Sequence, residues 1–349
     1  MYKSILRPIF FCFSAESIHH FVAAMLRFAR RIGMLPLLRA MFSYKHPSLE
    51  REVFGVKFPN PVGLAAGFDK NGDLYREMSA MGFGFVEVGT VTPKSQPGNP
   101  KPRIFRLKKD NALINRMGFP NKGLENMLKN LRKRNNNVVI GVNLGKNSLT
   151  SNEEAPSDYL KLFRSLYEYA DYFVVNVSCP NVKNITDLQN PDNLNAILEG
   201  LFEFRRGQNS YRPILLKISP DLSFEQIDSI IQILIDTPLD GLVAVNTTTS
   251  RSNLTTDSKT VKRIGNGGLS GAPITDRAIS IISHIHKKTE GHYPIIGVGG
   301  IMSPKDAQRM LDAGASLIQI YSGFIYEGPA FAKKICKHIR LAEETPKQQ

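Results

Sequence analysis

Cysteine is scarce in this chain of 349 residues: only Cys12, Cys179 and Cys336 occur, and they lie far apart. Such spacing excludes a disulfide framework and any CxxC-type zinc or iron–sulfur site, so we expect no metal. The chain also lacks any run of about 18 or more apolar residues, which argues against a membrane-spanning helix. Its hydrophobic content of 42% is nevertheless enough for a sizeable core, so the chain as a whole is not intrinsically disordered.

Acidic residues are few compared with basic ones, 31 Asp and Glu against 45 Lys and Arg, for a net charge of +14. The excess is concentrated in two segments. Residues 1–45 carry seven basic residues and one acidic residue, and residues 101–134 carry eleven and two. Localised positive charge indicates an anionic partner, which on this count alone is a membrane, a nucleic acid or a phosphorylated ligand.

The first basic segment has the pattern of two short amphipathic helices. Apolar residues at helical spacing form one face: Ile18, Phe21, Val22, Met25, Ala29 and Ile32. A second helix is predicted over residues 35–42, since Pro36 is tolerated in a first turn. Basic amphipathic helices fit an element that lies on an anionic bilayer, but a helical pair packed on its own domain has the same pattern. Both interpretations stay open at this point.

From residue 62 onward, short apolar runs alternate with longer helical patterns. The predicted strands are Val62–Ala66, Phe85–Gly89, Val138–Leu144, Tyr172–Val177, Ile214–Ile218, Gly241–Asn246, Ile295–Val298 and Leu317–Tyr321. Helices are predicted near residues 73–81, 121–133, 157–170, 192–205, 223–236, 274–288, 303–312 and 329–340. Eight such units predict an α/β fold, a closed (β/α)₈ TIM barrel. An open doubly wound sheet more often has fewer strands and a GxGxxG after the first one, which Gly63–Gly67 does not match.

Polar side chains follow nearly every predicted strand, at the end of a barrel where chemistry is expected. Lys70 and Lys217 bring positive charge, and the asparagines are Asn115, Asn143, Asn176, Asn181 and Asn246. A lone Asn after a strand is usually a turn residue. Several together predict a planar heterocycle, such as a pyrimidine or an isoalloxazine, because an amide offers both a donor and an acceptor.

Glycine-rich turns follow the late strands, at 267–271, 297–300 and 321–323. In barrels, the loops after the seventh and eighth strands expose backbone N–H groups at helix N-termini. We therefore expect a phosphate site there.

Cys179 lies in a polar loop after the fourth predicted strand and precedes a proline. Its thiol is a candidate base or nucleophile, since the unperturbed pKa of about 8.5 lies far below that of a hydroxyl. The alternative is an inert buried thiol, which is our interpretation of Cys336 in the last helix.

Taken together, these motifs resemble the dihydroorotate dehydrogenase family along nearly the whole chain. The segments that carry the resemblance occur in family order: residues 64–70, 115–119, 143–147 and 176–181, Lys217, and residues 246–248, 267–271 and 297–300. The N-terminal helical pair resembles the class 2 branch, which is membrane-associated and reduces quinone. The resemblance then implies a quinone tunnel, with His19, Arg103 and Arg106 as the polar residues near it.

The activity that this resemblance implies is oxidation of dihydroorotate to orotate in pyrimidine biosynthesis, with FMN taking a hydride and a membrane quinone reoxidising it. By position, the FMN contacts would be Ala66, Gly67, Lys70, Thr90, Asn143, Asn176, Lys217, Val245, Gly271, Gly300, Tyr321 and Ser322. The substrate contacts would be Lys70, Asn115, Arg116, Met117, Gly118, Phe119, Asn176, Asn181, Asn246 and Thr247. Cys179 would be the catalytic base.

Two positions depart from the class 2 pattern. The base of that branch is usually serine, whereas Cys179 resembles class 1 enzymes, which use fumarate or, through a partner subunit, NAD. Val245 stands where threonine is frequent, so its flavin contact would come from the backbone. A class 1-like acceptor therefore stays an alternative to quinone.

The resemblance also implies a division into an amphipathic membrane segment (residues 1–45), an FMN-binding barrel (46–340) and a polar tail (341–349). We expect a monomer, peripheral to the cytoplasmic side of a bacterial inner membrane, with an anionic membrane surface and no nucleic acid as partner. One rival is an FMN-dependent tRNA dihydrouridine synthase, which also has a cysteine base before a proline and would explain a basic surface. Another is a flavin-binding or membrane-adaptor protein without activity.

Overall fold

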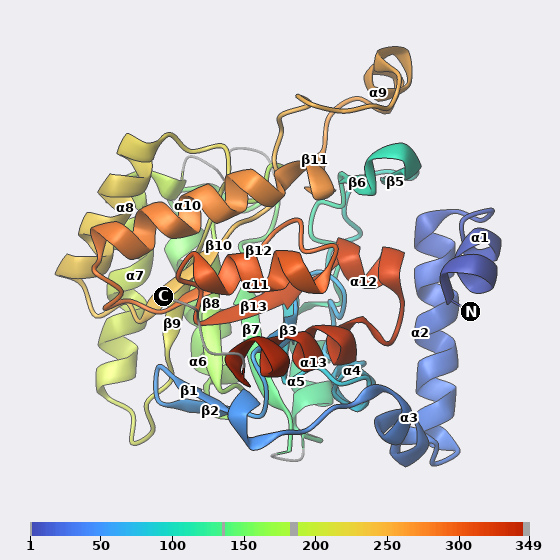
Figure 1. Ribbon diagram of the computed structural model, residues 1–349. Helices are drawn as coiled ribbons and strands as arrows, with labels where there is room; N and C mark the ends of the chain where they lie inside the picture. Colours follow the sequence, from blue (N-terminus) through green and yellow to red (C-terminus); the bar gives the residue numbers. More distant parts are fainter. Residues whose placement is uncertain (1, 135–136, 182–187, 345–349) are drawn as a thin grey trace.

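A closed barrel of eight parallel strands forms the centre of the computed structural model, which describes residues 2–134, 137–181 and 188–344 (Figure 1). Its strands are β3 (Val62–Leu64), β4 (Phe85–Val91), β7 (Val139–Leu144), β8 (Tyr172–Asn176), β9 (Ile214–Ile218), β10 (Gly241–Ala244), β12 (Ile295–Val298) and β13 (Leu317–Ile320). The last strand pairs with the first, with Ile318 opposite Val62. This closure confirms the predicted (β/α)₈ barrel and excludes an open sheet.

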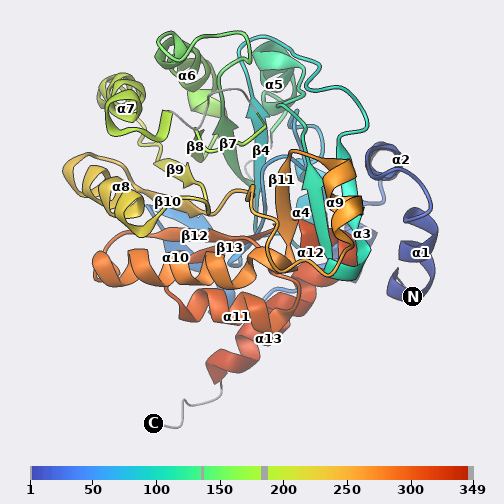
Figure 2. The same ribbon diagram turned by 90° about the horizontal axis from the view of Figure 1, so that it is seen from above.

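Helices surround the barrel, as the view from above shows (Figure 2). They are α4 (Tyr75–Ala80), α5 (Gly123–Leu131), α6 (Ala155–Leu166), α7 (Pro191–Arg206), α8 (Phe224–Asp236), α10 (Thr275–Lys288), α11 (Pro304–Asp312) and α13 (Phe331–Glu344). Local signals fix some of their starts. At α8, the Ser223 hydroxyl accepts from the Gln226 N–H, and the Gln226 side chain accepts from the Ser223 N–H, which is a capping box.

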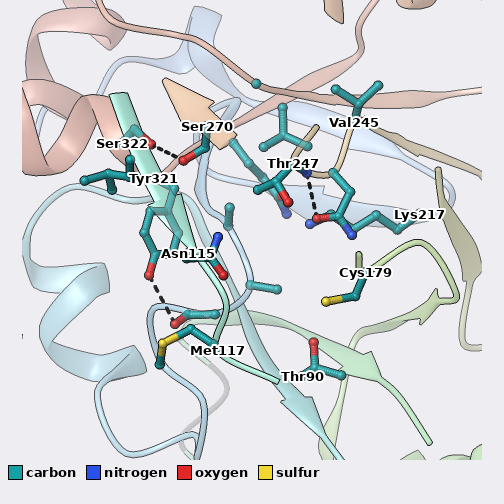
Figure 3. A pocket seen from close by; sticks show the side chains of 18 of the residues that line it. Thr90, Asn115, Met117, Cys179, Lys217, Val245, Thr247, Ser270, Tyr321 and Ser322 are labelled. Carbon is teal, nitrogen blue, oxygen red and sulfur yellow. Dashed lines mark hydrogen bonds between the residues drawn. The ribbon is translucent and has the colours of Figure 1, made fainter. Parts of the chain in front are cut away.

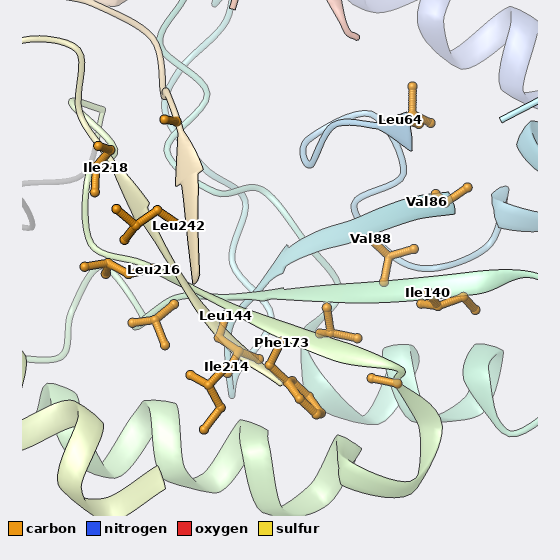
Figure 4. Packing of buried hydrophobic residues seen from close by; sticks show 14 of the residues in the cluster. Leu64, Val86, Val88, Ile140, Leu144, Phe173, Ile214, Leu216, Ile218 and Leu242 are labelled. Carbon is orange, nitrogen blue, oxygen red and sulfur yellow. The ribbon is translucent and has the colours of Figure 1, made fainter. Parts of the chain in front are cut away.

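Alternation along the strands divides the apolar core into two layers. Outward-facing side chains, such as Val88 and Phe173, pack between the barrel and its helices (Figure 4). Inward-facing ones, such as Phe85, fill the barrel at the amino ends of its strands. The hairpin β1 (Arg51–Val53) and β2 (Val56–Phe58) closes that end, since the Phe58 ring lies 5.1 Å from the Phe85 ring. Only the opposite, carboxyl end is left for a ligand.

A three-stranded antiparallel sheet beside the barrel mouth was not expected from the sequence. It consists of β5 (Ile104–Leu107), β6 (Ala112–Asn115) and β11 (Gly268–Gly271), in the order β11-β6-β5. Other unexpected elements are α9 (Ser258–Ile264), α12 (Ser322–Glu327), η2 (Pro47–Leu49), η3 (Lys108–Asp110) and η6 (Ala272–Ile274), whereas η4 (Tyr167–Tyr169) lies within the helix predicted near residues 157–170. The sheet pairs strands that are far apart in the chain, which local periodicity does not encode.

The N-terminal segment lies along one side of the barrel as η1 (Tyr2–Leu6), α1 (Arg7–Phe10), α2 (Ala15–Arg31) and α3 (Leu35–Phe42), which confirms the two predicted helices (Figures 1 and 2). Many of its large apolar side chains are exposed: Ile5, Ile9, Phe13, Phe21, Met25, Phe28, Ile32, Met34, Leu37 and Met41. Among the described residues, no single helix has the length and apolar content of a membrane span. Taken together, Tyr2–Phe10 and Ala15–Arg31 have that length and apolar content, but the two helices are bent by 117° relative to each other.

The predicted division of the chain at residues 45 and 340 stays a prediction. Helix α13 runs on to Glu344. Residues 345–349 of the expected tail lie outside the described residues.

Candidate active site

A cavity opens at the carboxyl ends of the barrel strands, where a (β/α)₈ barrel places its chemistry. Figure 3 shows Cys179 and Lys217 on one side of it and Asn115, Met117 and Tyr321 on the other. The expected ligand residues that line it are Ala66, Gly67, Lys70, Thr90, Asn115, Met117, Gly118, Phe119, Asn176, Cys179, Asn181, Lys217, Val245, Asn246, Thr247, Gly271, Gly300, Tyr321 and Ser322. Residues that follow strands all around the barrel therefore line the same cavity.

Two of the expected ligand residues do not line this cavity. Asn143 is fully buried beneath it, where its Oδ1 accepts from Thr90 Oγ1 at 2.5 Å and from Asn176 Nδ2 at 3.0 Å. The Arg116 guanidinium instead donates to the carbonyl of Ile264, outside the cavity. Asn143 thus orients two side chains that do line the cavity, and the Arg116 side chain holds an outer loop.

A buried carboxylate, Glu87 on β4, lies under the same side chains. Its two oxygens accept from Asn143 Nδ2 at 2.7 Å and from Gln319 Nε2 at 2.6 Å. The Nζ atom of Lys217 lies 3.9 Å from Glu87 Oε1. Because Glu87 is fully buried and Lys217 almost so, each charge offsets part of the cost of burying the other. Lys217 therefore lines the floor of the cavity as a cation, and its carboxylate partner lies beneath it.

Burial governs the acidity of the Cys179 thiol. It raises the pKa of Cys179 to about 11, although a backbone hydrogen bond from Asn181 and the charge of Lys217 act in the opposite direction. At pH 7 the thiolate is then on the order of 10⁻⁴ of the population. In Figure 3 the sulfur points toward the space between the labelled side chains. The free protein holds a protonated thiol there and no preformed thiolate.

Lys70 lines both this cavity and a second one. Its Nζ donates to the carbonyl of Gly67. Burial lowers the pKa of Lys70 to about 8, while the nearby Glu16 carboxylate acts in the opposite direction. At pH 7 the ammonium form still predominates, so an anionic ligand meets a positive charge in a poorly hydrated place.

The second cavity, of about 840 Å³, lies between the N-terminal helices and the barrel. The expected residues His19, Arg103 and Arg106 line it. Burial, and then the charge of Lys70, lower the pKa of His19 to about 3, so its imidazole is neutral at pH 7. Arg103 pairs with Glu16 at 2.7 Å. Residues shared by both cavities are Lys70, Ile104, Leu113, Met117, Pro120 and Tyr321. A ligand in the second cavity thus lies directly beside the barrel site.

The cavity wall after β12 and β13 has the features of a phosphate site. The backbone at residues 299–300 and 322–323 lines it, and the Oγ atoms of Ser270 and Ser322 lie 2.9 Å apart (Figure 3). Glycine there lets backbone N–H groups approach an anion closely. Together with the amides and the Lys217 cation, this donor set fits a planar heterocycle that carries a phosphate.

Within the described ranges, no three His, Cys, Asp or Glu side chains gather as metal ligands.

Sequence reasoning missed three residues of this site: Ser270, Glu87 and Gln319. Ser270 lies in the 267–271 turn, which was singled out for its glycines alone. Glu87 is the charged residue in the otherwise apolar start of β4, and Gln319 is the polar residue of β13. A charged or amide side chain inside an apolar parallel strand signals a partner inside the barrel, and here Glu87 pairs with Lys217.

Comparisons with known proteins agree with this geometry. The family model described as dihydroorotate dehydrogenase matches residues 48–342. A protein of Christiangramia forsetii named dihydroorotate dehydrogenase (quinone) is 51% identical over 340 residues, which cover 97% of this chain and 98% of that one. A protein of the same name from Synechococcus sp. (strain JA-3-3Ab) is 45% identical and covers 98% and 93%.

Among solved structures, the dihydroorotate dehydrogenase of Eimeria tenella in complex with ferulenol is similar, with a TM-score of 0.82 and 36% identity over 92% of this chain and 90% of that one. The ligand-free form of the same enzyme has a TM-score of 0.80 and 37% identity, covering 88% and 92%.

Proposed function

Because the chain belongs to the dihydroorotate dehydrogenase family, we propose that it oxidises dihydroorotate to orotate in pyrimidine biosynthesis and passes the electrons to a quinone. The observation that carries this function is the meeting of Cys179, Lys70 and Lys217 in one cavity, next to a second cavity that shares Lys70 with it. The relatives named for the quinone-dependent enzyme align along nearly their full length.

FMN is the proposed cofactor, and the residues of the barrel cavity fit its parts. The backbone at Gly300 and Gly271, with Ser322, fits its phosphate. Thr90, Asn176, Lys217 and the Val245 backbone fit the polar edge of the ring, with Asn143 acting from below. Ala66, Gly67, Lys70 and Tyr321 complete the wall around it. Bound there, the flavin supplies the hydride-accepting group between substrate and quinone.

The proposed catalytic base is Cys179, whose Sγ takes the C5 proton of dihydroorotate. Burial keeps this thiol protonated in the free protein, so the reactive thiolate is the minor form and proton removal should speed up as pH rises. Lys70 would hold the substrate carboxylate. Amide and hydroxyl contacts would come from Asn115, Asn176, Asn181, Asn246 and Thr247, and residues 117–119 form the adjoining wall, whereas the Arg116 side chain turns away from it.

The proposed quinone tunnel is the 840 Å³ cavity under α1 and α2. The neutral His19 imidazole offers either a donor or an acceptor to a quinone oxygen, and Arg103, fixed by Glu16, offers a further donor. The exposed apolar side chains of residues 1–45 would lie on an anionic phospholipid surface, on the cytoplasmic side of a bacterial inner membrane. We propose a monomer with no nucleic-acid partner.

Anaerobic titration of the yellow holoprotein with dihydroorotate tests this function. We expect the flavin absorbance to bleach, and added ubiquinone or menaquinone to restore it faster than fumarate or NAD does. A flavin that dihydroorotate leaves oxidised would refute the dehydrogenase. Bleaching followed by faster reoxidation with fumarate or NAD would keep the dehydrogenase and reject the quinone.

A further inference from the structure

Five exposed cations form a cluster on the barrel domain, outside both cavities. Two of them, Lys108 and Lys109, lie at the turn between β5 and β6, and the others, Lys259, Lys262 and Arg263, lie on α9. We call these five residues the basic rim. None of them has an acidic group within salt-bridge distance among the described residues.

The two segments that carry the rim are fastened to each other. The Asp110 carboxylate accepts from Thr255 N at 2.5 Å and from Thr256 N at 3.1 Å. Leu254, which precedes α9, and Ile264, its last residue, pack on the apolar cluster of the outer sheet. Asp110, the acid next to Lys108 and Lys109, is thus occupied by hydrogen bonds, and Asp257, the acid next to α9, accepts from Thr260 N at its N-terminus. Helix α9 is held in place although it stands away from the barrel (Figure 1).

The rim adjoins the exposed apolar side of the N-terminal segment. Lys108 Nζ lies 5.9 Å from the centre of the Phe11 ring, and Arg106 Nη1 donates to the carbonyl of Phe13 at 2.6 Å. Phe13 is 59% exposed and Ile9 is 52% exposed. Figures 1 and 2 both place α9, β5 and β6 on the side of the barrel that carries α1 and α2. Unpaired cations thus border an apolar face.

That juxtaposition matches the chemistry of an anionic bilayer, where apolar side chains enter the acyl boundary and cations meet the headgroups. A single-stranded nucleic acid would instead call for exposed aromatic rings as stacking platforms. Two rings beside the rim are partly covered, since Arg106 lies 4.5 Å over Phe11 and Arg116 lies 4.7 Å over Phe105. Phe13 beside them is exposed, but a single ring does not make a row of stacking platforms.

We propose that the basic rim is a second membrane contact, made by the barrel domain itself with the headgroups of anionic phospholipids. The inference rests on the proposed function, in which residues 1–45 lie on a membrane, and adds a contact that this segment does not supply. Two separate contacts restrain the barrel from rolling about α1 and α2. The tunnel mouth is then held toward the bilayer that dissolves the quinone.

The experiment compares full-length holoprotein variants in co-sedimentation with two kinds of vesicle, phosphatidylcholine alone and phosphatidylcholine mixed with phosphatidylglycerol. The rim variant carries Lys259→Glu, Lys262→Glu and Arg263→Glu. The matched control carries Lys129→Glu, Arg132→Glu and Lys133→Glu, which are equally exposed, have no salt bridge among the described residues and lie at the end of α5. Both variants change the net charge by the same amount.

We expect the parent to prefer the anionic vesicles and the rim variant to lose at least about tenfold of that affinity, since each cation near such a surface contributes roughly fivefold. Binding to neutral vesicles should be unchanged, and the control should stay within about twofold of the parent. A second variant with glutamine at the three α9 positions should lose an intermediate amount. Flavin reduction by dihydroorotate in solution should be the same in all of these proteins, which verifies that each is folded.

Equal affinity of the rim variant and the parent for anionic vesicles would overturn the rim alone. Equal losses in the rim variant and the control would assign the effect to net charge and overturn it as well. A parent that binds neither kind of vesicle would overturn both the rim and the membrane part of the proposed function, while leaving flavin reduction intact. Tight binding of single-stranded RNA that only the rim variant loses would reassign the cluster to nucleic acid.

Discussion

The barrel mouth and the N-terminal segment differ in how many of their side chains are buried or hydrogen-bonded within the protein. At the mouth, Asn143, Asn176 and Glu87 are buried and hydrogen-bonded to one another or to neighbours. In the N-terminal helices, by contrast, Ala23 is the buried residue of α2, and large apolar side chains face outward. The polar side chains of the mouth are thus already held in place for a ligand. The N-terminal helices instead expose an apolar surface of the kind that contacts a membrane or another protein.

A few polar contacts join the two regions. Arg27 pairs with Asp73 at 3.3 Å, and Arg30 lies 3.3 Å from the buried Glu77. Glu16 holds Arg103, and the shared residue Lys70 lies where the two cavities meet. The two half-reactions, flavin reduction and flavin reoxidation, should therefore respond to different substitutions.

The largest effect is expected inside the mouth. Cys179→Ala removes the proton acceptor and should slow flavin reduction by dihydroorotate about 10²- to 10⁴-fold, measured by anaerobic stopped-flow absorbance. FMN should stay bound, because the cavity wall is otherwise intact. The control is Cys336→Ala, which removes a buried thiol of α13 far from the cavity and should leave the rate unchanged.

Cys179→Ser sharpens the same test, since a hydroxyl is a much weaker acid than a thiol. Some activity should remain, with the pH optimum moved upward. An unchanged pH–rate profile would reject direct proton transfer to the thiolate.

The second-largest effect is expected on quinone turnover, from changes in the N-terminal segment. Removal of residues 1–45 takes away one wall of the tunnel, so quinone turnover should be lost while dihydroorotate still bleaches the flavin. Val22→Phe is the milder variant: it fills part of the 840 Å³ cavity and leaves the helices in place. Steady-state quinone reduction and stopped-flow flavin reduction, measured on both proteins, separate the half-reactions. Equal quinone rates in truncated, filled and parent proteins would refute the tunnel.

The same contrast explains what the sequence could predict. The barrel strands and most helices follow from period and length, because each is a local pattern of apolar residues. The convergence of Lys70, Cys179 and Lys217 follows as well, since strand ends of a closed barrel meet at one mouth. The direction of a side chain does not follow: Arg116 lies in a ligand-like motif, yet its guanidinium turns to the carbonyl of Ile264. That contact joins residues far apart in the chain.

Counting charges along the sequence likewise predicted only part of the basic surface. It placed positive charge in residues 1–45 and 101–134, but it did not separate Lys108 and Lys109 beside α1 from the cations at the end of α5. It also passed over α9, whose basic residues matter only because the fold brings them to the β5–β6 turn.

The third prediction concerns pH, and it links the two cavities through Lys70. Burial lowers the pKa of Lys70 to about 8, so the ammonium is present below that pH and is lost about tenfold per unit above it. If Lys70 holds the substrate carboxylate, kcat/KM for dihydroorotate should stop rising near pH 8 and level off above it, since this ratio reports groups of the free enzyme and the loss of the Lys70 ammonium offsets the growing Cys179 thiolate. The kcat limb should rise to higher pH, because the pKa of Cys179 is about 11 and a bound anion keeps Lys70 charged. A kcat/KM that keeps rising to pH 10 would remove Lys70 from substrate binding.

The smallest effect is expected from Glu87, which lines neither of the two described cavities and acts through Lys217. Glu87→Gln keeps a hydrogen-bonding side chain of nearly the same shape but leaves the Lys217 cation, 3.9 Å away, without its counter-charge. An uncompensated cation favours the reduced, more negative flavin, so the midpoint potential of bound FMN should rise by on the order of 30 mV, a tenfold change for a two-electron couple. Spectrophotometric reduction against a reference dye measures it. Glu77→Gln is the matched control, because that carboxylate is equally buried but pairs with Arg30 under α2. If both variants shift the potential alike, or neither does, then Glu87 only fills space in the barrel, and the floor of the mouth is set by packing rather than by charge.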